Sequence, residues 1–389
     1  MAVMHQGESG SVAECLPVDW QQAVLVGRLL TSEGPTPIVV AEGRVRDVSR
    51  AAATVAELLT GWNGVPSGTD LGPVEALPLA RAYASTERER LLAPFDLQCI
   101  KACGVTFAVS AVERVIEERA RGSAERAQTI REALRERVGT DVRSVKPGSP
   151  EAVRLKEALL ADGLWSQYLE VAIGPDAEVF TKAPVLSSVG CGDWIGIRTD
   201  SAWNNPEPEI VLACDGHGRA LGATLGNDVN LRDIEGRSAL LLGKAKDNNA
   251  SCAIGPFIRM FDASFGIDDV RRAVVTLEVR GEDGYRLHGQ SSMEQISRDP
   301  LELVRQTLGE HHYPDGFALF LGTMFAPVED RDVPGRGFTH KTGDIVRVSS
   351  PKLGMLENKV TTCSAAAPWS FGIGALMRNL ASRNLLDPR

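Results

Sequence analysis

The feature that most constrains the fold is a short apolar run flanked by acidic residues, between Asn205 and Asp228. Glu207 and Glu209 lie two residues apart where the run begins, so in a strand both carboxylates would point to the same face. The Asp-Gly-His-Gly segment at 215–218 predicts a turn. Chain reversal there would bring Asp228 back beside the two glutamates. The pattern therefore predicts three carboxylates converging at one end of a strand pair.

Carboxylates that lie this close repel one another, so such a cluster requires a neutralising cation or a protonated member. An all-oxygen ligand set favours Mg²⁺, with Mn²⁺ as a substitute and Ca²⁺ as a weaker alternative. The competing interpretation places Glu207 and Glu209 on a solvated edge strand and gives Asp228 only a role in a turn. Lys246, taken alone, is typical of a surface lysine. If it faced the cluster, its ammonium could bind a substrate carboxylate or stabilise developing negative charge.

Composition narrows the classes of partner. The chain has 42 basic and 51 acidic residues, a net charge of -9, which argues against nucleic acid or an anionic membrane and leaves a small anionic substrate open. No leader-like start and no apolar run of about 18 residues occurs. We therefore expect a cytoplasmic protein. The seven scattered cysteines should be reduced, and the six histidines form no metal-ligand pattern.

The length of 389 residues predicts a large catalytic domain with a smaller one appended. We expect a small N-terminal α/β domain over residues 1–95 and the catalytic domain over 96–389. In the first, residues 23–26 and 38–45 predict a β-hairpin around Glu42-Gly43, and residues 54–59 predict a short helix. The charged stretch 85–95 predicts a helical connector.

Helices and then strands are predicted in the second domain. Helical spacing of apolar residues covers 112–120, resumes from 127 to 139, and returns after Ser149-Pro150, where serine is a good cap and proline a good first residue. Strand-like segments dominate from about 168 to 360. They are residues 169–173, 193–198, 210–214, 273–279 and 345–348.

Further motifs occur in a fixed order along the chain. They are Phe180-Thr-Lys182, Glu207-Pro-Glu209, Asn227-Asp228-Val-Asn-Leu-Arg232-Asp233, Lys246 with Gly255-Pro256 nine residues later, Gly322-Thr323, Gly343-Asp344 and Leu353-Gly-Met-Leu356-Glu-Asn358. Each is weak alone, but in this order they resemble the fumarylacetoacetate hydrolase family. The resemblance extends from about Asp96 to the C-terminus.

This resemblance implies an α+β, mainly β fold, a mixed β-roll or sandwich with a helical lid. It implies Glu207, Glu209 and Asp228 as metal ligands. The residues implied for catalysis are Glu178, Lys182, Lys246 and Thr323. Those implied for substrate binding are Thr106, Ser110, Arg232, Lys246 and Thr323.

One departure from the family pattern concerns hydrolysis. Hydrolases of the family carry a histidine and a glutamate that activate water, and here Ser110 stands in the histidine position with Glu113 after it. A serine hydroxyl is a poor base near neutral pH. The Gly-Val-Thr-Phe-x-x-Ser form is instead similar to the 2-keto-3-deoxy sugar acid dehydratases of the family. Glu113 either faces the site or caps a helix, and Glu178 could instead be an exposed hairpin residue.

These motifs lead to a hypothesis of magnesium-dependent dehydration of 2-keto-3-deoxypentonate to 2,5-dioxopentanoate. Glu178 would take the C3 proton, and Lys182 or Lys246 would stabilise the enolate. The first alternative is hydrolysis of an acylpyruvate or a 2,4-diketo-3-deoxy sugar acid, with Glu113 orienting water. The second is a non-catalytic sugar-acid-binding protein. We expect no nucleic-acid or membrane partner, and a homo-oligomer, either a dimer or a tetramer.

Overall fold

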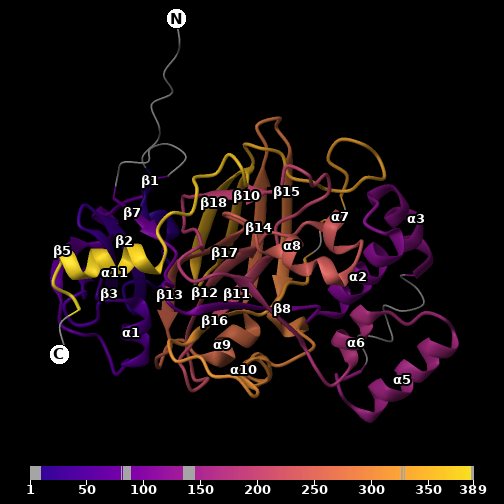
Figure 1. Cartoon of the computed structure of the whole chain (residues 1–389), viewed down its shortest axis with the longest axis horizontal. Coiled ribbons are helices and arrows are strands. Elements are labelled where there is room, and N and C mark those ends of the chain that lie inside the picture. Colours follow the sequence, from indigo (N-terminus) through magenta and orange to yellow (C-terminus); the bar gives the residue numbers. More distant parts are fainter. Residues whose placement is uncertain are drawn as a thin grey trace, which may run out of the picture.

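Two β-sheets form the centre of the molecule, and helices lie at both ends (Figure 1). The computed structural model describes residues 10–79, 81, 89–134, 145–325, 327 and 329–386. The predicted α+β class with mainly β character is confirmed. Among the described residues, no helix is both long and apolar enough to span a membrane.

The larger sheet has eleven strands among the described residues, and the acidic cluster lies on its middle strands. Apart from the parallel pair of β16 and β8, its neighbouring strands are antiparallel. Across the sheet the strands are β5 (Thr69–Pro73), β4 (Arg44–Asp47), β3 (Gly34–Ala41), β2 (Leu25–Thr31), β13 (Cys252–Met260), β12 (Ala220–Asp228), β11 (Pro208–Cys214), β16 (Phe317–Phe320), β8 (Cys99–Gly104) and β9 (Glu178–Ala183), and β7 (Arg90–Leu92) also pairs with β2.

The smaller sheet packs against one face of the larger one. Its strands in order are β10 (Trp194–Ile197), β18 (Gly354–Thr362), β17 (Ile345–Ser350), β14 (Val274–Arg280) and β15 (Arg286–Ser292). A short pair, β1 (Gly10–Ser11) with β6 (Pro78–Leu79), lies apart from both sheets. Leu212 of β11 and Val346 of β17 belong to the core between the sheets, whereas Val211 and Ala213 belong to a core on the opposite face. Every residue of β11 is buried because both of its faces are covered.

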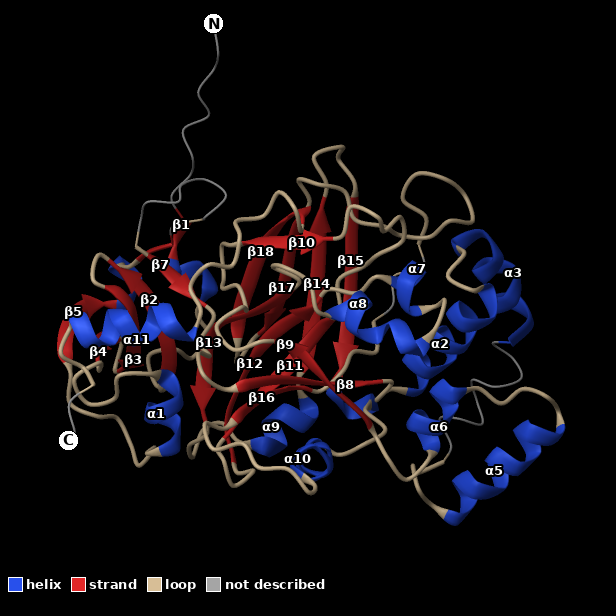
Figure 2. Cartoon of the chain, viewed as in Figure 1, coloured by secondary structure: helices blue, strands red, loops and turns tan. Residues whose placement is uncertain are grey.

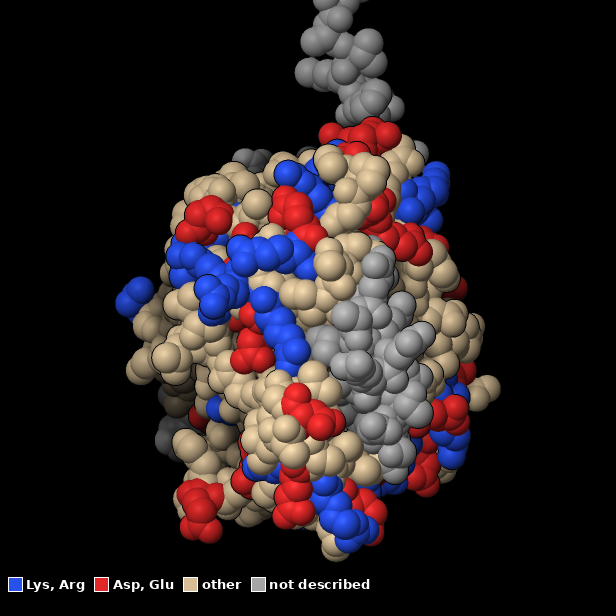
Figure 3. Space-filling model, turned by 90° about the vertical axis from the view of Figure 1, so that its right-hand side faces the viewer, with Lys and Arg blue, Asp and Glu red and all other residues tan. Residues whose placement is uncertain are grey.

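Among the described residues, four helices gather at one end of the sheets (Figure 2). They are α2 (Ala108–Ala120), α3 (Ala124–Leu134), α5 (Pro150–Ala161) and α6 (Gln167–Ile173). Their inward side chains, including Val112, Ile116, Leu159 and Leu169, form a separate apolar cluster. On their outer side, acidic and basic side chains are interspersed (Figure 3). These helices are therefore amphipathic, with α2 nearest to the acidic cluster.

The remaining helices are short or peripheral. They are α1 (Val55–Thr60), α7 (Arg232–Glu235), α8 (Leu242–Lys246), α9 (Ile267–Arg272), α10 (Pro300–Leu308) and α11 (Ile373–Ser382). Helix α11 packs beside the N-terminal strands, where Asn379 donates a hydrogen bond to the carbonyl of Glu33 at 2.7 Å. Both α7 and α8 lie close to the acidic cluster and supply charged side chains to it.

Several predicted elements are confirmed. Helix α1 begins after Thr54, whose hydroxyl accepts a hydrogen bond from the amide of Glu57 at 3.0 Å. Helix α5 has Ser149 as its cap and Pro150 in its first turn, and α2 begins at Ala108, earlier than predicted. The helix predicted to reach residue 139 is α3, which ends at Leu134, and residues 135–139 lie outside the described part.

Three predictions of secondary structure were wrong in part. Residues 169–173 form helix α6, because Leu169, Ala172 and Ile173 pack together on the helical cluster and Ser166 caps the helix. The predicted hairpin is a meander of β2, β3 and β4, and Glu42-Gly43 turns only between the last two. In the charged connector, residues 90–92 form strand β7 on β2, and residues 82–88 lie outside the described part.

The N-terminal strands continue the large sheet, because β2 pairs with β13. The domain boundary near residue 95 stays a prediction. At that position, Asp96 accepts hydrogen bonds from the amides of Val55 at 2.7 Å and Ala56 at 3.0 Å. Its carboxylate lies 3.8 Å from buried Arg28, which also donates to the carbonyl of Phe95 at 2.6 Å. Asp96 thus joins helix α1 to strand β2.

Replacement of Asp96 by Ala should lower the free energy of unfolding by about 3 kcal/mol, because backbone donors lose their acceptor and Arg28 stays buried without its counter-charge. Urea denaturation measures this change. Asp70→Ala is the matched control, since Asp70 pairs with Arg44 on the surface and should matter little. Equal effects of the two substitutions would contradict the role given to Asp96.

Candidate metal and substrate site

The three predicted carboxylates converge where β11 begins and β12 ends. Glu207 precedes β11, Glu209 lies within it, and Asp228 is the last residue of β12. The amide of Asp228 donates to the carbonyl of Glu207 at 3.0 Å, which fixes the two residues opposite each other. One oxygen from each carboxylate lies within 4.8 Å of the others, and all three residues are buried. The solvated edge strand is therefore excluded.

Basic side chains compensate part of this negative charge. The ammonium of Lys246 lies 2.5 Å from Glu207 and 3.0 Å from Asp228, so it bridges two of the carboxylates. Lys182 is fully buried and lies 2.7 Å from Asp228. Arg114 of α2 contacts Glu207 at 2.5 Å. Lys246 thus lies buried at the carboxylate cluster and is not a surface lysine.

The pKa values show how the charges are balanced. Burial, and then the charges of Asp228 and Glu207, raise the pKa of Glu209 well above its ordinary value. Burial also acts on Asp228, but Lys182 and Lys246 outweigh it and lower the pKa of that carboxyl. Burial lowers the pKa of Lys246, but the nearby carboxylates, Asp228 first, outweigh it and raise that pKa. Glu209 is the carboxylate that most lacks a positive neighbour.

This set of donors fits a hard divalent cation. Three carboxylates offer oxygen ligands of the kind that Mg²⁺ takes in proteins. The ammonium of Lys246, placed between Glu207 and Asp228, shows that the cluster already draws a positive charge into its centre. Glu209 accepts a hydrogen bond from the amide of Gly322 at 2.6 Å, which orients it toward the same point. Glu207, Glu209 and Asp228 are therefore the residues that could hold the ion.

A pocket opens beside the cluster and is lined largely by charged residues. The described residues that line it include Ser110, Glu113, Arg114, Glu117, Glu178, Phe180, Asn205, Glu207, Glu209, Asp228, Arg232, Glu235, Lys246, Gly322, Thr323 and Phe325. Helix α2 contributes four of these side chains, from positions 110, 113, 114 and 117, which lie on one helical face. The pocket thus lies between α2 and the middle of the large sheet.

Glu178, the first residue of β9, faces this pocket. Burial, and then the charge of Glu235, raise the pKa of Glu178 to about 7. It pairs across the sheet with Gly104 of β8, and a Cβ atom at Gly104 would lie only 1.9 Å from the Glu178 carboxylate. The glycine therefore leaves the space in which this carboxylate lies, and Glu178 is not an exposed hairpin residue.

The other predicted residues divide into two groups. Ser110 and Thr323 line the pocket, and the Ser110 hydroxyl donates to the carbonyl of Phe107 at 2.8 Å. Lys182 and Thr106 are not among the residues that line it. The Thr106 hydroxyl donates to the carbonyl of Leu321 at 2.7 Å, beside the glycine whose amide contacts Glu209. Thr106 therefore supports the site from behind.

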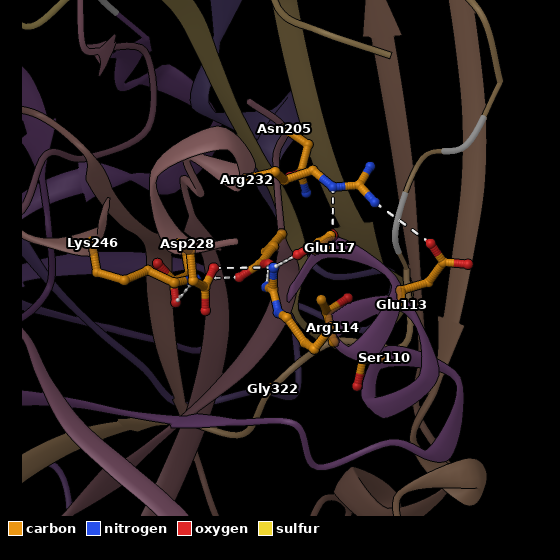
Figure 4. Close-up of polar contacts among 12 residues, drawn as sticks. Ser110, Glu113, Arg114, Glu117, Asn205, Asp228, Arg232, Lys246 and Gly322 are labelled. Carbon is orange, nitrogen blue, oxygen red and sulfur yellow. Dashed lines mark hydrogen bonds and ion pairs between the residues drawn. The ribbon is translucent and has the colours of Figure 1, made fainter. Parts of the chain in front are cut away.

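Arg232 lines the pocket, but its guanidinium is already engaged (Figure 4). It donates to Glu117 at 2.6 Å and to the carbonyl of Pro327 at 2.9 Å, and it lies 4.3 Å from the ring centre of Trp203. Glu113 lies inside α2 and 3.6 Å from Arg232, so it faces the site and does not cap the helix.

Sequence reasoning missed a set of charged residues around Arg114. Its guanidinium lies 2.6 Å from Glu117 and 3.0 Å from Glu235, in addition to Glu207. Figure 4 shows Arg114 pointing from α2 toward the cluster. The signal was present, because Ser110, Glu113, Arg114 and Glu117 form a polar stripe at helical spacing. The stripe indicates a polar helix face, and the structure shows that this face lines the pocket.

Comparisons with known proteins were made with this geometry in hand. No family model matches the chain. The chain is 32% identical over 179 residues to 2-dehydro-3-deoxy-D-arabinonate dehydratase of Saccharolobus solfataricus, over 46% of this chain and 57% of that protein. It is 29% identical over 212 residues to the "Probable 2-keto-3-deoxyxylonate dehydratase" of Haloferax volcanii, over 54% of this chain and 68% of that one. The match thus spans little more than half of the first relative.

Solved structures agree with this result. A 2-keto-3-deoxy-D-arabinonate dehydratase complexed with magnesium and 2,5-dioxopentanoate matches with a TM-score of 0.61 at 20% identity, over 87% of this chain and 99% of that one. A fumarylacetoacetate hydrolase of Exiguobacterium antarcticum matches with a TM-score of 0.53 at 17% identity, over 87% and 100%. The chain therefore has the fold of the fumarylacetoacetate hydrolase proteins, and its predicted resemblance to the 2-keto-3-deoxypentonate dehydratases is confirmed.

Proposed function

We propose that this chain is a magnesium-dependent hydro-lyase that converts 2-keto-3-deoxypentonate to 2,5-dioxopentanoate. The observation that carries this proposal is the position of Glu178. A half-buried carboxyl with a pKa of about 7 shares one pocket with three carboxylates that suit Mg²⁺. The two dehydratase relatives support the same reaction class. Mn²⁺ should substitute for Mg²⁺, because the ligands are all oxygens.

Different residues of the pocket carry out different steps of the proposed dehydration. A magnesium ion on the carboxylate cluster would polarise the 2-oxo group of the substrate and acidify its C3 proton. Glu178 takes that proton, for which a pKa near neutrality is well suited. Loss of the C4 hydroxyl completes the elimination of water, with protonated Glu178 or a water held by Thr323 as the proton source. Tautomerisation of the unsaturated product then gives 2,5-dioxopentanoate.

Lys246 binds the substrate from its position at the carboxylate cluster. Its ammonium is charged at neutral pH, since nearby carboxylates raise its pKa, and it lies at the carboxylate cluster. From there it can bind the substrate carboxylate, or the substrate oxygen on which negative charge develops. Lys182 acts through Asp228, which it contacts from a fully buried position. Its role is to position a metal ligand.

Hydrolysis is the weaker candidate on this geometry. A hydrolase would need a base to activate water. The Ser110 hydroxyl is a poor base, and it donates its proton in a hydrogen bond to the carbonyl of Phe107. Glu113 does face the pocket, but Arg232 lies 3.6 Å from it and offsets its charge. A non-catalytic sugar-acid-binding protein would not require a carboxyl with a raised pKa, such as Glu178, in this pocket. Both alternatives are outcomes of the test below.

The first test is turnover. Purified protein with 2-keto-3-deoxypentonate and Mg²⁺ should produce 2,5-dioxopentanoate, detected with an NADP-dependent semialdehyde dehydrogenase, and EDTA should abolish the signal. Release of pyruvate from an acylpyruvate without any dehydration would instead establish hydrolysis. Binding of the sugar acid without turnover of either substrate would support the non-catalytic alternative.

The second prediction concerns the metal ligands. Glu207→Gln should weaken Mg²⁺ binding by about tenfold or more and abolish turnover, because an amide cannot replace the charge of a ligand carboxylate. Calorimetric titration measures the affinity, and circular dichroism checks that the variant is folded. Glu125→Gln, at an exposed residue paired with Arg336, is the control. Unchanged Mg²⁺ affinity in Glu207→Gln would remove Glu207 from the ligand set.

The third prediction concerns Glu178 and pH. A base must be deprotonated to act, so kcat/KM should be at its maximum above the pKa of Glu178 and should fall as the pH drops through that pKa. The apparent pKa should be about 7, or slightly lower once a cation binds nearby. The pH profile of kcat/KM measures this limb. Glu178→Gln should keep Mg²⁺ affinity and lose most of the rate. A flat profile from about pH 5 to about pH 8 would speak against Glu178 as the base.

A further inference from the structure

Arg114 joins three carboxylates that come from three separate elements. One terminal nitrogen, Nη1, lies 2.6 Å from Glu117 of α2 and 3.0 Å from Glu235 of α7. The other, Nη2, lies 2.5 Å from Glu207, the first of the three clustered carboxylates. The side chain is only 12% exposed and it lines the pocket. Helix α2 is therefore tied directly to a candidate metal ligand.

Besides Lys246, which contacts the cluster directly, two buried cations flank the site and are fixed in place. Arg232 is engaged by Glu117, by the carbonyl of Pro327 and by the ring of Trp203. Lys182 is fully buried against Asp228 and does not line the pocket. Arg114 differs because one end of its guanidinium is anchored by two carboxylates and the other end meets the cluster. Only the second end has to move if its partner changes.

A divalent cation in the cluster would change that partner. Both oxygens of Glu207 now contact protein cations, Oε1 with Arg114 and Oε2 with Lys246. A metal ion bound by Glu207 would neutralise part of the negative charge of that carboxylate, and it would repel the guanidinium a few ångströms away. Nη1 keeps Glu117 and Glu235 throughout. Nη2 is then a charged donor that points into the pocket, and it lacks a partner as negative as Glu207 was.

We propose that Arg114 is a substrate-binding residue that exchanges Glu207 for the carboxylate of an anionic sugar acid when a cation occupies the cluster. The inference rests on the proposed function for the class of substrate. A guanidinium suits this role, because its planar fork can hold protein carboxylates on one side and a substrate carboxylate on the other.

A substrate-binding role and a purely structural role of Arg114 predict opposite changes in Mg²⁺ affinity when its charge is removed. If Arg114 competes with the metal ion for Glu207, loss of its charge strengthens Mg²⁺ binding and weakens substrate binding. If Arg114 only orients Glu207 as a ligand, its loss weakens Mg²⁺ binding as well. The direction of the change in Mg²⁺ affinity therefore separates the two roles.

The experiment compares wild type with Arg114→Met, Arg114→Lys and Arg119→Met. Arg119 lies on the same helix, donates to the carbonyl of Gly163 and does not line the pocket, so its loss controls for charge on α2. Mg²⁺ affinity is measured by calorimetric titration without substrate, and kcat and KM are measured with 2-keto-3-deoxypentonate. Circular dichroism checks the fold of each variant.

In Arg114→Met, Mg²⁺ should bind about threefold more tightly or better, because a repelling charge is gone. KM should rise by about tenfold to about a hundredfold, the loss expected for a charge-assisted hydrogen bond. Arg114→Lys should keep wild-type Mg²⁺ affinity and still raise KM, since one ammonium cannot hold Glu117 and Glu235 and also reach the substrate. Arg119→Met should match wild type in both.

Weaker Mg²⁺ binding in Arg114→Met, or an unchanged KM, would overturn the inference. If Arg114→Met does not fold, Arg114→Lys decides, and a wild-type KM in that variant overturns it. If the wild-type protein turns over no sugar acid, the proposed function fails by itself. The Mg²⁺ titrations need no substrate, so unchanged or weaker affinity in Arg114→Met would then still refute competition for Glu207.

Discussion

The buried contacts of Glu207 with Lys246 and Arg114 are the interaction on which the rest of the site depends. They bring together a strand start, the end of helix α8 and the middle of helix α2, three segments that are far apart in the chain. Charges taken out of water need partners of good geometry. Each of these elements is therefore held where its charge is satisfied, and the pocket between α2 and the sheet takes its shape from that requirement.

The same crowding of charge sets the chemistry. Glu209 and Glu178 both have raised pKa values because they are buried among other carboxylates, whereas the lysines lower that of Asp228. Acids in one pocket thus have pKa values shifted in opposite directions, an arrangement that is typical of functional sites. Gly104 takes part by leaving room for the Glu178 carboxylate.

Much of the cluster could be predicted, because Glu207, Glu209 and Asp228 follow from strand alternation and one turn. The polar stripe of α2 was missed, since a charged helix face usually meets water and only tertiary packing buries it. For residues 169–173, a short apolar run suits either a strand or a buried helix, and packing on the helical cluster decided. The oligomeric state, the cytoplasmic location and the domain boundary near residue 95 stay predictions.

The pairing of β2 with β13 has a consequence for any attempt to produce residues 96–389 alone. All nine residues of β13, Cys252–Met260, are buried, and β2 pairs with that strand at Ile258 and Arg259. A fragment that starts after residue 95 would leave part of β13 as an apolar edge with unpaired backbone groups. Such an edge invites pairing between molecules. In the whole chain, strand β2 occupies that part of the β13 edge.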